Sequence, residues 1–384
     1  MPAVITDVPP ASDRSDTETE YVQLLDPTGH RVHNDTYTPL VAGLDQDAIQ
    51  GFYRDMVLVR RLDTEATALQ RQGELGLWPQ SLGQEAAQVG SGRALAAQDY
   101  VFPSYREHGV AWTRGVAPGA LLHLFRGRDH GGWDPGAHNF NNYTLVIGSQ
   151  TLHATGYAMG LQRDGDVGTG DPGRDRAVVA YFGDGATSQG DVYEAMVFAA
   201  VNDAPVVFFC QNNQWAISEP TSRQSRVPLA QRADGVGIPS IRVDGNDVLA
   251  SYAVTRAATD RARSGGGPVM IEAVTYRMGA HTTSDDPTRY RSRAEEDYWR
   301  RRDPIDRLRL LLEAESTPPD FFTGVDADAD ELAARLREYC QQLTGPPPAS
   351  IFADVYATEN SVVAAEQEWF TTYQAGFADE QEAR

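Results

Sequence analysis

Hydrophobic residues along the chain follow two spacings: short continuous runs, and positions three or four residues apart. Strand-like apolar runs begin at Ala177, Val206, Ser240 and Pro268, and such runs are typical of strands buried on both faces. Segments with helical spacing lie at residues 45–72, 82–97, 119–125 and 150–163, near Asp191 and near Val248. Because the two kinds of segment alternate, we expect an α/β fold, with a mainly parallel sheet and helices on both faces.

The pattern changes after Tyr290, where charged helices replace the strands. We expect these helices at residues 293–302, 304–314 and 328–343. A stiff connector, GPPP at residues 345–348, precedes a last predicted helix that contains Ile351, Phe352, Val355 and Tyr356. These apolar side chains suit either core packing or a subunit contact. We therefore expect a flexible arm (residues 1–40), an α/β domain (41–290) and a C-terminal helical region (291–384).

The charge of the chain restricts its partners. Lys and Arg number 33 against 54 Asp and Glu, which gives a formal net charge of −21 and a pI near 4.7. Such a surface repels nucleic acid and anionic membranes and suits a basic protein partner. The two cysteines, Cys210 and Cys340, argue against a disulfide framework, and the first residues resemble neither a secretory signal nor a transit peptide. No apolar run reaches membrane-spanning length, so we expect a cytoplasmic protein without a membrane or nucleic-acid partner.

Two polar motifs follow the first two strand-like runs. The sequence GDG at residues 183–185 follows one run, NN at residues 212–213 follows the next, and the 26 residues 186–211 lie between them. Parallel neighbours end on the same side of their sheet, which brings Asp184 and Asn213 to one rim. Carboxylate and amide oxygens are typical ligands for Mg²⁺, and the glycines leave backbone amides free to face an anion. The two motifs predict a magnesium diphosphate site.

This segment, residues 181–218, resembles the thiamine diphosphate motif. Three other stretches are similar to signatures of one family: FPSYREHG at 102–109, IGSQTLHATG at 147–156 and YRMGAHTTSDDPTRYR at 276–291. From about residue 45 to residue 360 the chain resembles the alpha subunit of the decarboxylating component of a 2-oxo acid dehydrogenase complex. The resemblance implies a thiamine diphosphate-binding fold with thiamine diphosphate and Mg²⁺ as cofactors. It also implies a beta subunit in an alpha2beta2 heterotetramer and a lipoyl-bearing acyltransferase as partners.

The resemblance assigns metal and diphosphate contacts to named residues. The implied metal ligands are Asp184, Asn213 and the main-chain oxygen of Trp215. The implied diphosphate contacts come from the side chains of Tyr105 and Arg106 and from the backbone amides of Gly185 and Ala186.

The remaining assignments concern the reactive end of the cofactor. Leu145 and Ile147 match positions that hold the aminopyrimidine ring through main-chain atoms. His281 matches the histidine that approaches the diphosphate and the reacting centre and assists transfer to the lipoyl group, so it is the expected catalytic residue. A histidine in a polar loop after a buried strand agrees with such a role.

Two residues depart from the family pattern. Relatives often carry a second histidine where this chain has Ala280, which argues against a two-histidine mechanism within the chain. Relatives place a basic residue where this chain has Gln211, so fewer positive charges face the phosphates and we expect Gln211 to act as a hydrogen-bonding residue.

Some relatives have two further features, which stay open for this chain. Ser149 and Gln150 align with positions that bind a structural potassium ion in some relatives. Thr282, Ser284 and Ser292 lie near positions that are phosphorylated in others.

A glycine-rich segment before the first main strand is expected to be a loop. GTGDPG at residues 168–173 matches the dinucleotide-binding pattern, but it precedes a strand and has Pro172 where a helix should begin. The aspartates around it lack the spacing and the final glutamate of a calcium loop. We expect a solvated, hairpin-like insertion at residues 164–175.

The motifs together predict oxidative decarboxylation of a 2-oxo acid with transfer of the acyl group to a lipoyl arm. VDGNDV at 243–248 and SDDPTRYR at 284–291 favour a branched-chain substrate, with pyruvate as the alternative. The resemblance implies that another chain supplies the glutamate that activates the cofactor. A magnesium-dependent phosphotransferase would need a Walker lysine that the loop lacks, and a non-enzymatic assembly scaffold would not need the intact ligand set.

Overall fold

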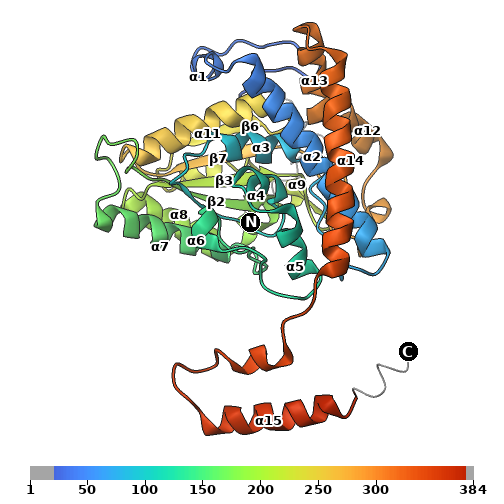
Figure 1. Cartoon of the computed structure of the whole chain (residues 1–384). Helices are drawn as coiled ribbons and strands as arrows, with labels where there is room; N and C mark the ends of the chain where they lie inside the picture. Colours follow the sequence, from blue (N-terminus) through green and yellow to red (C-terminus); the bar gives the residue numbers. More distant parts are fainter. Residues whose placement is uncertain (1–20, 378–384) are drawn as a thin grey trace, which may run out of the picture.

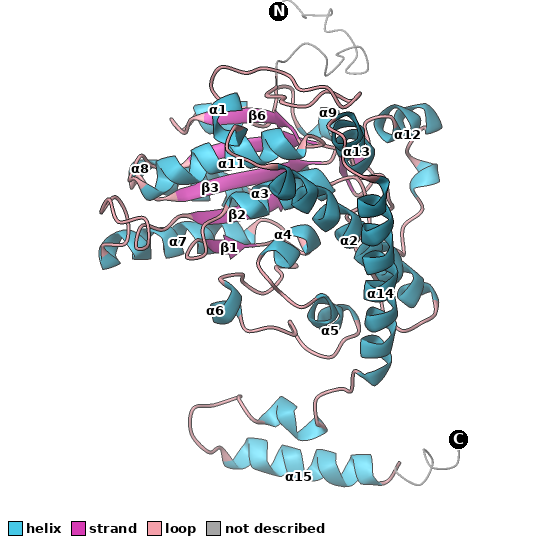
Figure 2. Ribbon diagram, turned by 45° about the horizontal axis from the view of Figure 1, so that its top comes forward, coloured by secondary structure: helices cyan, strands magenta, loops and turns pink. Residues whose placement is uncertain are grey.

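A five-stranded sheet in which all neighbours are parallel forms the centre of the structure, a computed structural model that describes residues 21–377. Its order is β1-β2-β3-β7-β6 (Figure 2). The strands are β1 (Tyr100–Phe102), β2 (Val178–Gly183), β3 (Val206–Asn212), β7 (Val269–Val274) and β6 (Ser240–Asp244), with a separate antiparallel pair of β4 (Trp215–Ala216) and β5 (Glu219–Pro220). The predicted α/β class and the four predicted strands are confirmed. β1 was not predicted as a strand because three residues are too short for a periodicity signal.

Helices cover both faces of the sheet because successive strand side chains point to opposite sides. On β2, Val178 and Ala180 belong to one hydrophobic cluster, whereas Val179 and Tyr181 belong to the other. The first cluster includes α7 (Ser149–Asp164) and α8 (Gly190–Val201), and the second includes α2 (Gln46–Arg71), α3 (Glu85–Ala94) and α11 (Val248–Arg263). Because the helices cover both faces, a ligand-binding site is expected in the polar loops at the carboxyl ends of the strands.

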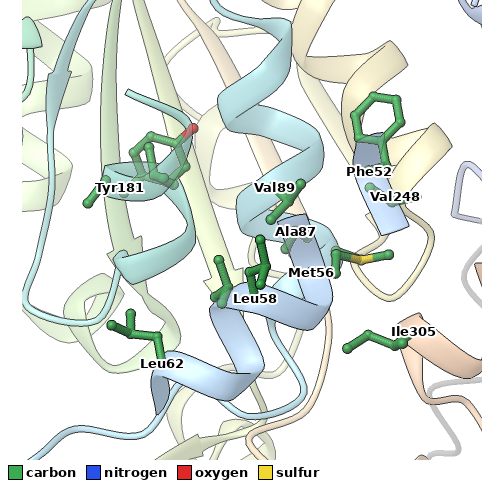
Figure 3. Packing of buried hydrophobic residues seen from close by; sticks show 14 of the residues in the cluster. Phe52, Met56, Leu58, Leu62, Ala87, Val89, Tyr181, Val248 and Ile305 are labelled. Atoms are coloured by element: carbon green, nitrogen blue, oxygen red, sulfur yellow. The ribbon is translucent and has the colours of Figure 1, made fainter. Parts of the chain in front are cut away.

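Close helix packing beside the sheet depends on small residues. Figure 3 shows Met56 and Leu58 of α2 near Ala87 of α3 in the larger cluster. Gly90 of α3 faces the start of α11, where an added Cβ atom would lie 2.6 Å from the carbonyl oxygen of Val248. Any side chain at this position would force the two helices apart.

Shorter helices connect the main elements. They are α1 (Thr38–Val41), α4 (His108–Thr113), η3 (Pro118–Leu121), α5 (Leu122–Phe125), α6 (Pro135–His138), η4 (Asp184–Ser188), α9 (Thr221–Gln224), α10 (Gln231–Asp234) and η5 (Pro287–Arg289). The helix predicted at 119–125 is thus divided between η3 and α5, and the helix predicted at 82–97 is shorter, because α3 ends at Ala94.

The C-terminal helices are α12 (Arg293–Arg300), α13 (Pro304–Ala314) and α14 (Pro319–Gln342), and α14 runs along the outside of α2 (Figure 1). Phe322 of α14 packs edge-on against Tyr53 of α2, with ring centroids 5.2 Å apart. α14 begins nine residues before the predicted start at 328, because Pro319 occupies the first turn, where proline is tolerated. The proposed domain division at residue 290 stays a prediction, since α13 and α14 belong to the same hydrophobic cluster as α2.

Residues 22–25 pack against the sheet, so the prediction of a loosely attached arm is wrong for this part. Val22 pairs in parallel with Val243 of β6, donating to the oxygen of Arg242 at 2.8 Å and accepting from Asp244 N–H at 3.0 Å. Leu24 and Leu25 are buried in the core. The rest of the predicted arm, residues 1–20, lies outside the described residues.

The last described segment stands away from the body of the molecule (Figure 1). It consists of the 3-10 helix η6 (Pro348–Phe352) and helix α15 (Ser361–Ala375), which contact each other through Phe352 and Phe370 at 5.7 Å between ring centroids. The predicted helix through Ile351, Phe352, Val355 and Tyr356 is wrong: these residues lie in η6 and the loop after it, while α15 begins after the cap Asn360. Ile351 and Tyr356 are about 60% exposed, so they do not pack in a core. Of the two expected roles, core packing and a subunit contact, the subunit contact stays a prediction.

The acidic, glycine-rich segment is a loop, as predicted. No strand or helix lies between Gly165 and Ala177. Asp175 closes the loop by accepting hydrogen bonds from the backbone of Thr169 at 2.7 Å and of Gly170 at 3.0 Å. Within residues 21–377, no helix is both long and apolar enough to cross a bilayer.

Asp247 joins the N-terminal segment to helix α11. Its Oδ1 accepts from the backbone of Leu249 at 2.9 Å and Ala250 at 3.0 Å, which caps the helix. Its Oδ2 accepts from Leu24 and Leu25, both at 2.6 Å. One carboxylate therefore satisfies four buried backbone N–H groups.

We predict that Asp247→Ala lowers the free energy of unfolding by about 3 kcal/mol or more, because four buried donors lose their acceptor. The matched control is Asp45→Ala, which removes an exposed cap of α2 with one partner, Ala48 N–H at 2.8 Å, and should cost about 1 kcal/mol. Urea unfolding measures the two losses, and hydrogen exchange at Leu24 and Leu25 should accelerate only in the first variant. Equal losses in the two variants would contradict the account.

Candidate functional site

The four sequence signatures meet around one cavity of about 480 Å³ at the carboxyl ends of β2 and β3. The loop after β1 contributes residues 104–107, the segment before α7 contributes Leu145 and Ile147, and the loop after β7 contributes His281 and Thr282. The ends of the two strands contribute residues 182–186 and then Gln211, Asn213 and Trp215. Every predicted site residue therefore lines this cavity, and the roles of these residues stay predictions.

Asp184 follows the last residue of β2 and is buried at 1% exposure. Its Oδ2 accepts from Gln224 Nε2 at 2.8 Å and from Thr221 Oγ1 at 3.4 Å. Burial raises the pKa of this carboxyl above its ordinary value. Gly185 beside it approaches Ala216 so closely that an added Cβ atom would lie 2.8 Å from the Ala216 Cβ.

The two asparagines at the end of β3 point to different partners. Asn212 donates to Glu272 at 2.7 Å inside the sheet and thus has a structural role. Asn213 donates from Nδ2 to Gln84 Oε1 at 2.9 Å, and its Oδ1 accepts from Trp215 N–H at 3.3 Å. Gln214 has a left-handed backbone with φ of 74°, which turns the chain back along the rim.

The cavity fits a hard cation with an anionic ligand. Within residues 21–377 no three His, Cys, Asp or Glu side chains are grouped so that they could hold a metal ion, so a metal here would need amide and carbonyl oxygens beside Asp184. Asn213 and Trp215, which line the same cavity as Asp184, offer such oxygens. Gln84 is buried, and its Nε2 atom has no hydrogen-bond partner among the described residues. An unpaired buried donor beside Asn213 is a group that a bound acceptor would satisfy.

Arg106 and His281 meet in the lining of the same cavity. Arg106 is buried at 6% exposure, and its Nη2 donates to the main-chain oxygen of His281 at 2.8 Å. The ring atom His281 Nδ1 lies 3.2 Å from Arg106 Nη2 and 2.8 Å from Nη1 of the buried Arg277. A guanidinium only donates, so Nδ1 is the acceptor and the proton of the neutral ring is on Nε2.

The charge state of His281 follows from the same contacts. Burial lowers the pKa of this imidazole to about 3, and the positive charges of Arg106 and Arg277 act in the same direction. Asp285 holds the loop by accepting from His281 N–H at 2.9 Å and from the Tyr290 hydroxyl in a short hydrogen bond. His281 is therefore a neutral donor at the cavity wall.

The other predicted residues differ in their exposure and in their hydrogen-bond partners. Leu145 and Ile147 are exposed at the rim of the cavity. Gln211 is buried with both ends engaged, since Oε1 accepts from Gln88 at 3.0 Å and Nε2 donates to Glu107 at 2.7 Å. Tyr105 lies beneath Arg106, whose Cζ atom is 5.5 Å from the ring centroid.

The residues named for potassium and phosphorylation also have partners. Ser149 Oγ donates to Val146 O at 2.9 Å, and Gln150 Nε2 donates to Tyr181 O at 2.8 Å. Gln150 Oε1 has no partner among the described residues and lies beside the cavity. Ser292 caps α12 through Glu295 N–H at 3.2 Å.

Sequence reasoning missed Gln84, Glu107 and Arg277. A signal existed for Arg277, because a charged residue three positions after a fully buried strand lies at the edge where sites form. Glu107 lies inside a recognised motif, where its charge beside a buried His108 indicated a paired or functional carboxyl. Gln84 carried no signal, since only the three-dimensional contacts reveal its unpaired donor.

We predict that His281 remains neutral, with its proton on Nε2, throughout pH 5–9. Replacing Arg277 with Met removes a positive charge, so the pKa of His281 should rise toward its ordinary value. Nitrogen-15 NMR of labelled histidine measures both the tautomer and the pKa. Arg289→Met, an exposed arginine of the same loop, is the control and should leave the pKa of His281 unchanged. Titration of wild-type His281 above pH 6 would contradict the geometry.

Comparison with known proteins places the chain in a family. The family described as "Dehydrogenase E1 component" matches residues 53–318. The "3-methyl-2-oxobutanoate dehydrogenase subunit alpha" of Mycobacterium tuberculosis is 46% identical over 356 residues, covering 91% of this chain and 93% of the relative. The "Pyruvate dehydrogenase E1 component subunit alpha" of Staphylococcus aureus is 40% identical over 303 residues, covering 78% of this chain and 79% of the relative. The chain belongs to the dehydrogenase E1 component family.

Proposed function

We propose that this chain is the alpha subunit of a thiamine diphosphate-dependent 2-oxo acid dehydrogenase that acts on a branched-chain 2-oxo acid. The carrying observation is the cavity that collects Arg106, Asp184, Asn213 and His281 at the carboxyl ends of β2 and β3. Family membership implies thiamine diphosphate as the cofactor. When bound, that cofactor supplies the carbanion stabilisation that loss of CO₂ from a 2-oxo acid requires.

The residues around the cavity divide into metal and diphosphate groups. Asp184, Asn213 and the main-chain oxygen of Trp215 would hold Mg²⁺, an oxygen set that suits a hard cation. Arg106 and Tyr105, which line the same cavity, would face the diphosphate. The backbone amides of Gly185 and Ala186, at the start of η4, and the free Nε2 of Gln84 would complete the diphosphate contacts, with Gln211 behind them.

His281 would be the catalytic residue. Its Nδ1 is held by Arg106 and Arg277, and its Nε2 has no partner among the described residues. The Nε2–H group therefore holds a proton at the cavity wall and is oriented to donate a hydrogen bond to the substrate or to the lipoyl group during acyl transfer. Ala280 lies where a second histidine would stand, so the single ring of His281 would serve the transfer step.

The exposed residues at the rim of the cavity favour an interface with a second chain. Leu145, Val146, Ile147 and Ile217 are exposed there, and the backbone of Leu145 and Ile147 would hold the aminopyrimidine ring. Exposed apolar residues that surround a site are typical of a subunit interface. Glu107 is the one glutamate among the described residues that line the cavity, and its carboxylate is hydrogen-bonded to Gln211, which we place behind the diphosphate. The glutamate that activates the aminopyrimidine ring would therefore come from the partner.

The C-terminal segment supports the same partner. In α15 the exposed Val362, Trp369 and Tyr373 have no core of their own, and an isolated helix of this length is marginal in water. A beta subunit would cover the helix in an alpha2beta2 heterotetramer, and a lipoyl-bearing acyltransferase would accept the acyl group. The relatives are themselves alpha subunits by name.

Substrate choice rests on the comparisons and on the motifs. The branched-chain relative is more similar than the pyruvate relative and matches a larger share of the chain. Pyruvate remains the alternative. A potassium ion near Gln150, phosphorylation at Thr282, Ser284 or Ser292 and a cytoplasmic location stay predictions.

We expect the purified chain alone to release no CO₂ from 3-methyl-2-oxobutanoate with thiamine diphosphate and Mg²⁺, because the activating glutamate is absent. Addition of the beta chain should start the reaction, with a higher kcat/KM for 3-methyl-2-oxobutanoate than for pyruvate. Labelled CO₂ release measures both. Full turnover by the lone chain would contradict the divided site, whereas a preference for pyruvate in the mixture would overturn only the substrate choice.

A further inference from the structure

Glu107 is a buried carboxyl in the cavity wall that the proposed mechanism does not use. It is 2% exposed, and its Oε1 accepts from Gln211 Nε2 at 2.7 Å. Its Oε2 accepts a long hydrogen bond from Arg106 N–H, at 3.4 Å, and the backbone N–H groups of Ser104 and of Glu107 itself also donate to the carboxylate and lower its pKa. The Arg106 guanidinium instead donates to Gln80 O and His281 O, so Glu107 forms no ion pair within residues 21–377. A carboxylate without an ion pair is costly to keep charged next to an anionic ligand.

The hydrogen bonds behind Glu107 have a fixed direction. The backbone N–H of Gly109 can only donate, and it faces Gln88 Oε1 at 2.8 Å. Gln88 Nε2 then donates to Arg106 O at 2.9 Å and to Gln211 Oε1 at 3.0 Å, which turns the Gln211 amide N–H groups toward Glu107. A carboxylic acid can accept this bond as well as a carboxylate can. The site thus accommodates Glu107 in either protonation state.

Among Glu107 and the titratable side chains around it, Glu107 is the group whose charge changes near neutral pH. Burial raises its pKa to about 7, while Arg106 acts in the opposite direction. Tyr143, from the segment before α7, and Tyr181 of β2 are neutral, because burial raises the pKa of both hydroxyls. His108 of α4 is neutral, because burial lowers its pKa to about 3. The groups that α3 and β3 place against it are the uncharged amides Gln88 and Gln211.

We propose that Glu107 takes up a proton from solvent when the cavity binds thiamine diphosphate, so that cofactor binding is coupled to protonation of this carboxyl group. The inference rests on the proposed function. The negative diphosphate makes the charged carboxylate less favourable, and the proton binds the carboxyl oxygen that Gln211 does not hold. Protonation removes the negative charge that would repel the diphosphate.

The coupling fixes the sign of the pH dependence. The bound state carries more protons than the free state wherever free Glu107 is ionised, so affinity falls as pH rises above about 7. The effect is absent below that range, where the free carboxyl is already protonated. Because the diphosphate and its magnesium complex also titrate, the difference between wild type and a variant isolates the contribution of Glu107.

Calorimetry of the assembled alpha–beta enzyme, freed of cofactor, tests the proposal. Thiamine diphosphate with Mg²⁺ is titrated at pH 8 in buffers of different ionisation enthalpy, which gives the number of protons taken up. We expect the wild type to take up close to one proton more than Glu107→Gln. Between pH 8 and pH 9 the wild-type Kd should rise about tenfold more than that of the variant.

Two controls separate the alternatives. Glu107→Asp keeps a carboxyl group and should retain proton uptake, and Asp234→Asn, an exposed carboxyl on α10, should behave as the wild type. Equal proton uptake by the wild type and Glu107→Gln would overturn the inference. So would a Kd that changes equally with pH, between pH 7.5 and pH 9, in the wild type and in Glu107→Gln. Failure of the wild type to bind thiamine diphosphate would overturn the proposed function itself.

Discussion

The removal of charged side chains from water at the carboxyl ends of β2 and β3 is the constraint on which the rest of the site depends. Arg106, Glu107, Asp184 and Arg277 are all buried at this edge. A buried charge is tolerated where hydrogen bonds or opposite charges compensate for lost water. Helices on both faces of the sheet exclude solvent elsewhere, so each of these groups depends on protein partners or on a ligand. The same burial lowers the pKa of His281 and raises those of Glu107 and Asp184.

Periodicity predicted four strands of the sheet, the strand-end motifs placed Asp184 and Asn213 at one rim, and the family resemblance named the other expected residues that line the cavity. They failed where length or context decides: β1 has three residues, and Pro319 begins α14 although proline usually marks an end. The packed segment around Val22 was missed because its partner, β6, is more than 200 residues away. Partners of charged side chains, such as Arg277 with His281, cannot be read from spacing, because they depend on loops that meet only in the folded chain.

The structure is consistent with a site that one chain builds in part. The residues proposed to bind the diphosphate all come from this chain, and the cavity lining also contains an unpaired donor on Gln84 and a neutral His281. The rim around Leu145 and Ile217 is apolar and exposed, and α15 stands apart with its aromatic residues uncovered (Figure 1). Both features have a physical explanation if a second chain covers them, because burial of such surfaces drives association. The acidic remainder of the surface would then face solvent.

The central claim is that Asp184 holds the magnesium ion through which thiamine diphosphate binds at the end of β2. Calorimetry of thiamine diphosphate binding to the assembled enzyme, with and without Mg²⁺, tests it most directly. In Asp184→Ala the magnesium-dependent affinity should fall by more than about 100-fold, since a direct ligand is lost. Asp234→Ala, an exposed carboxyl, should bind as the wild type does. Undiminished magnesium-dependent affinity in Asp184→Ala would contradict the account.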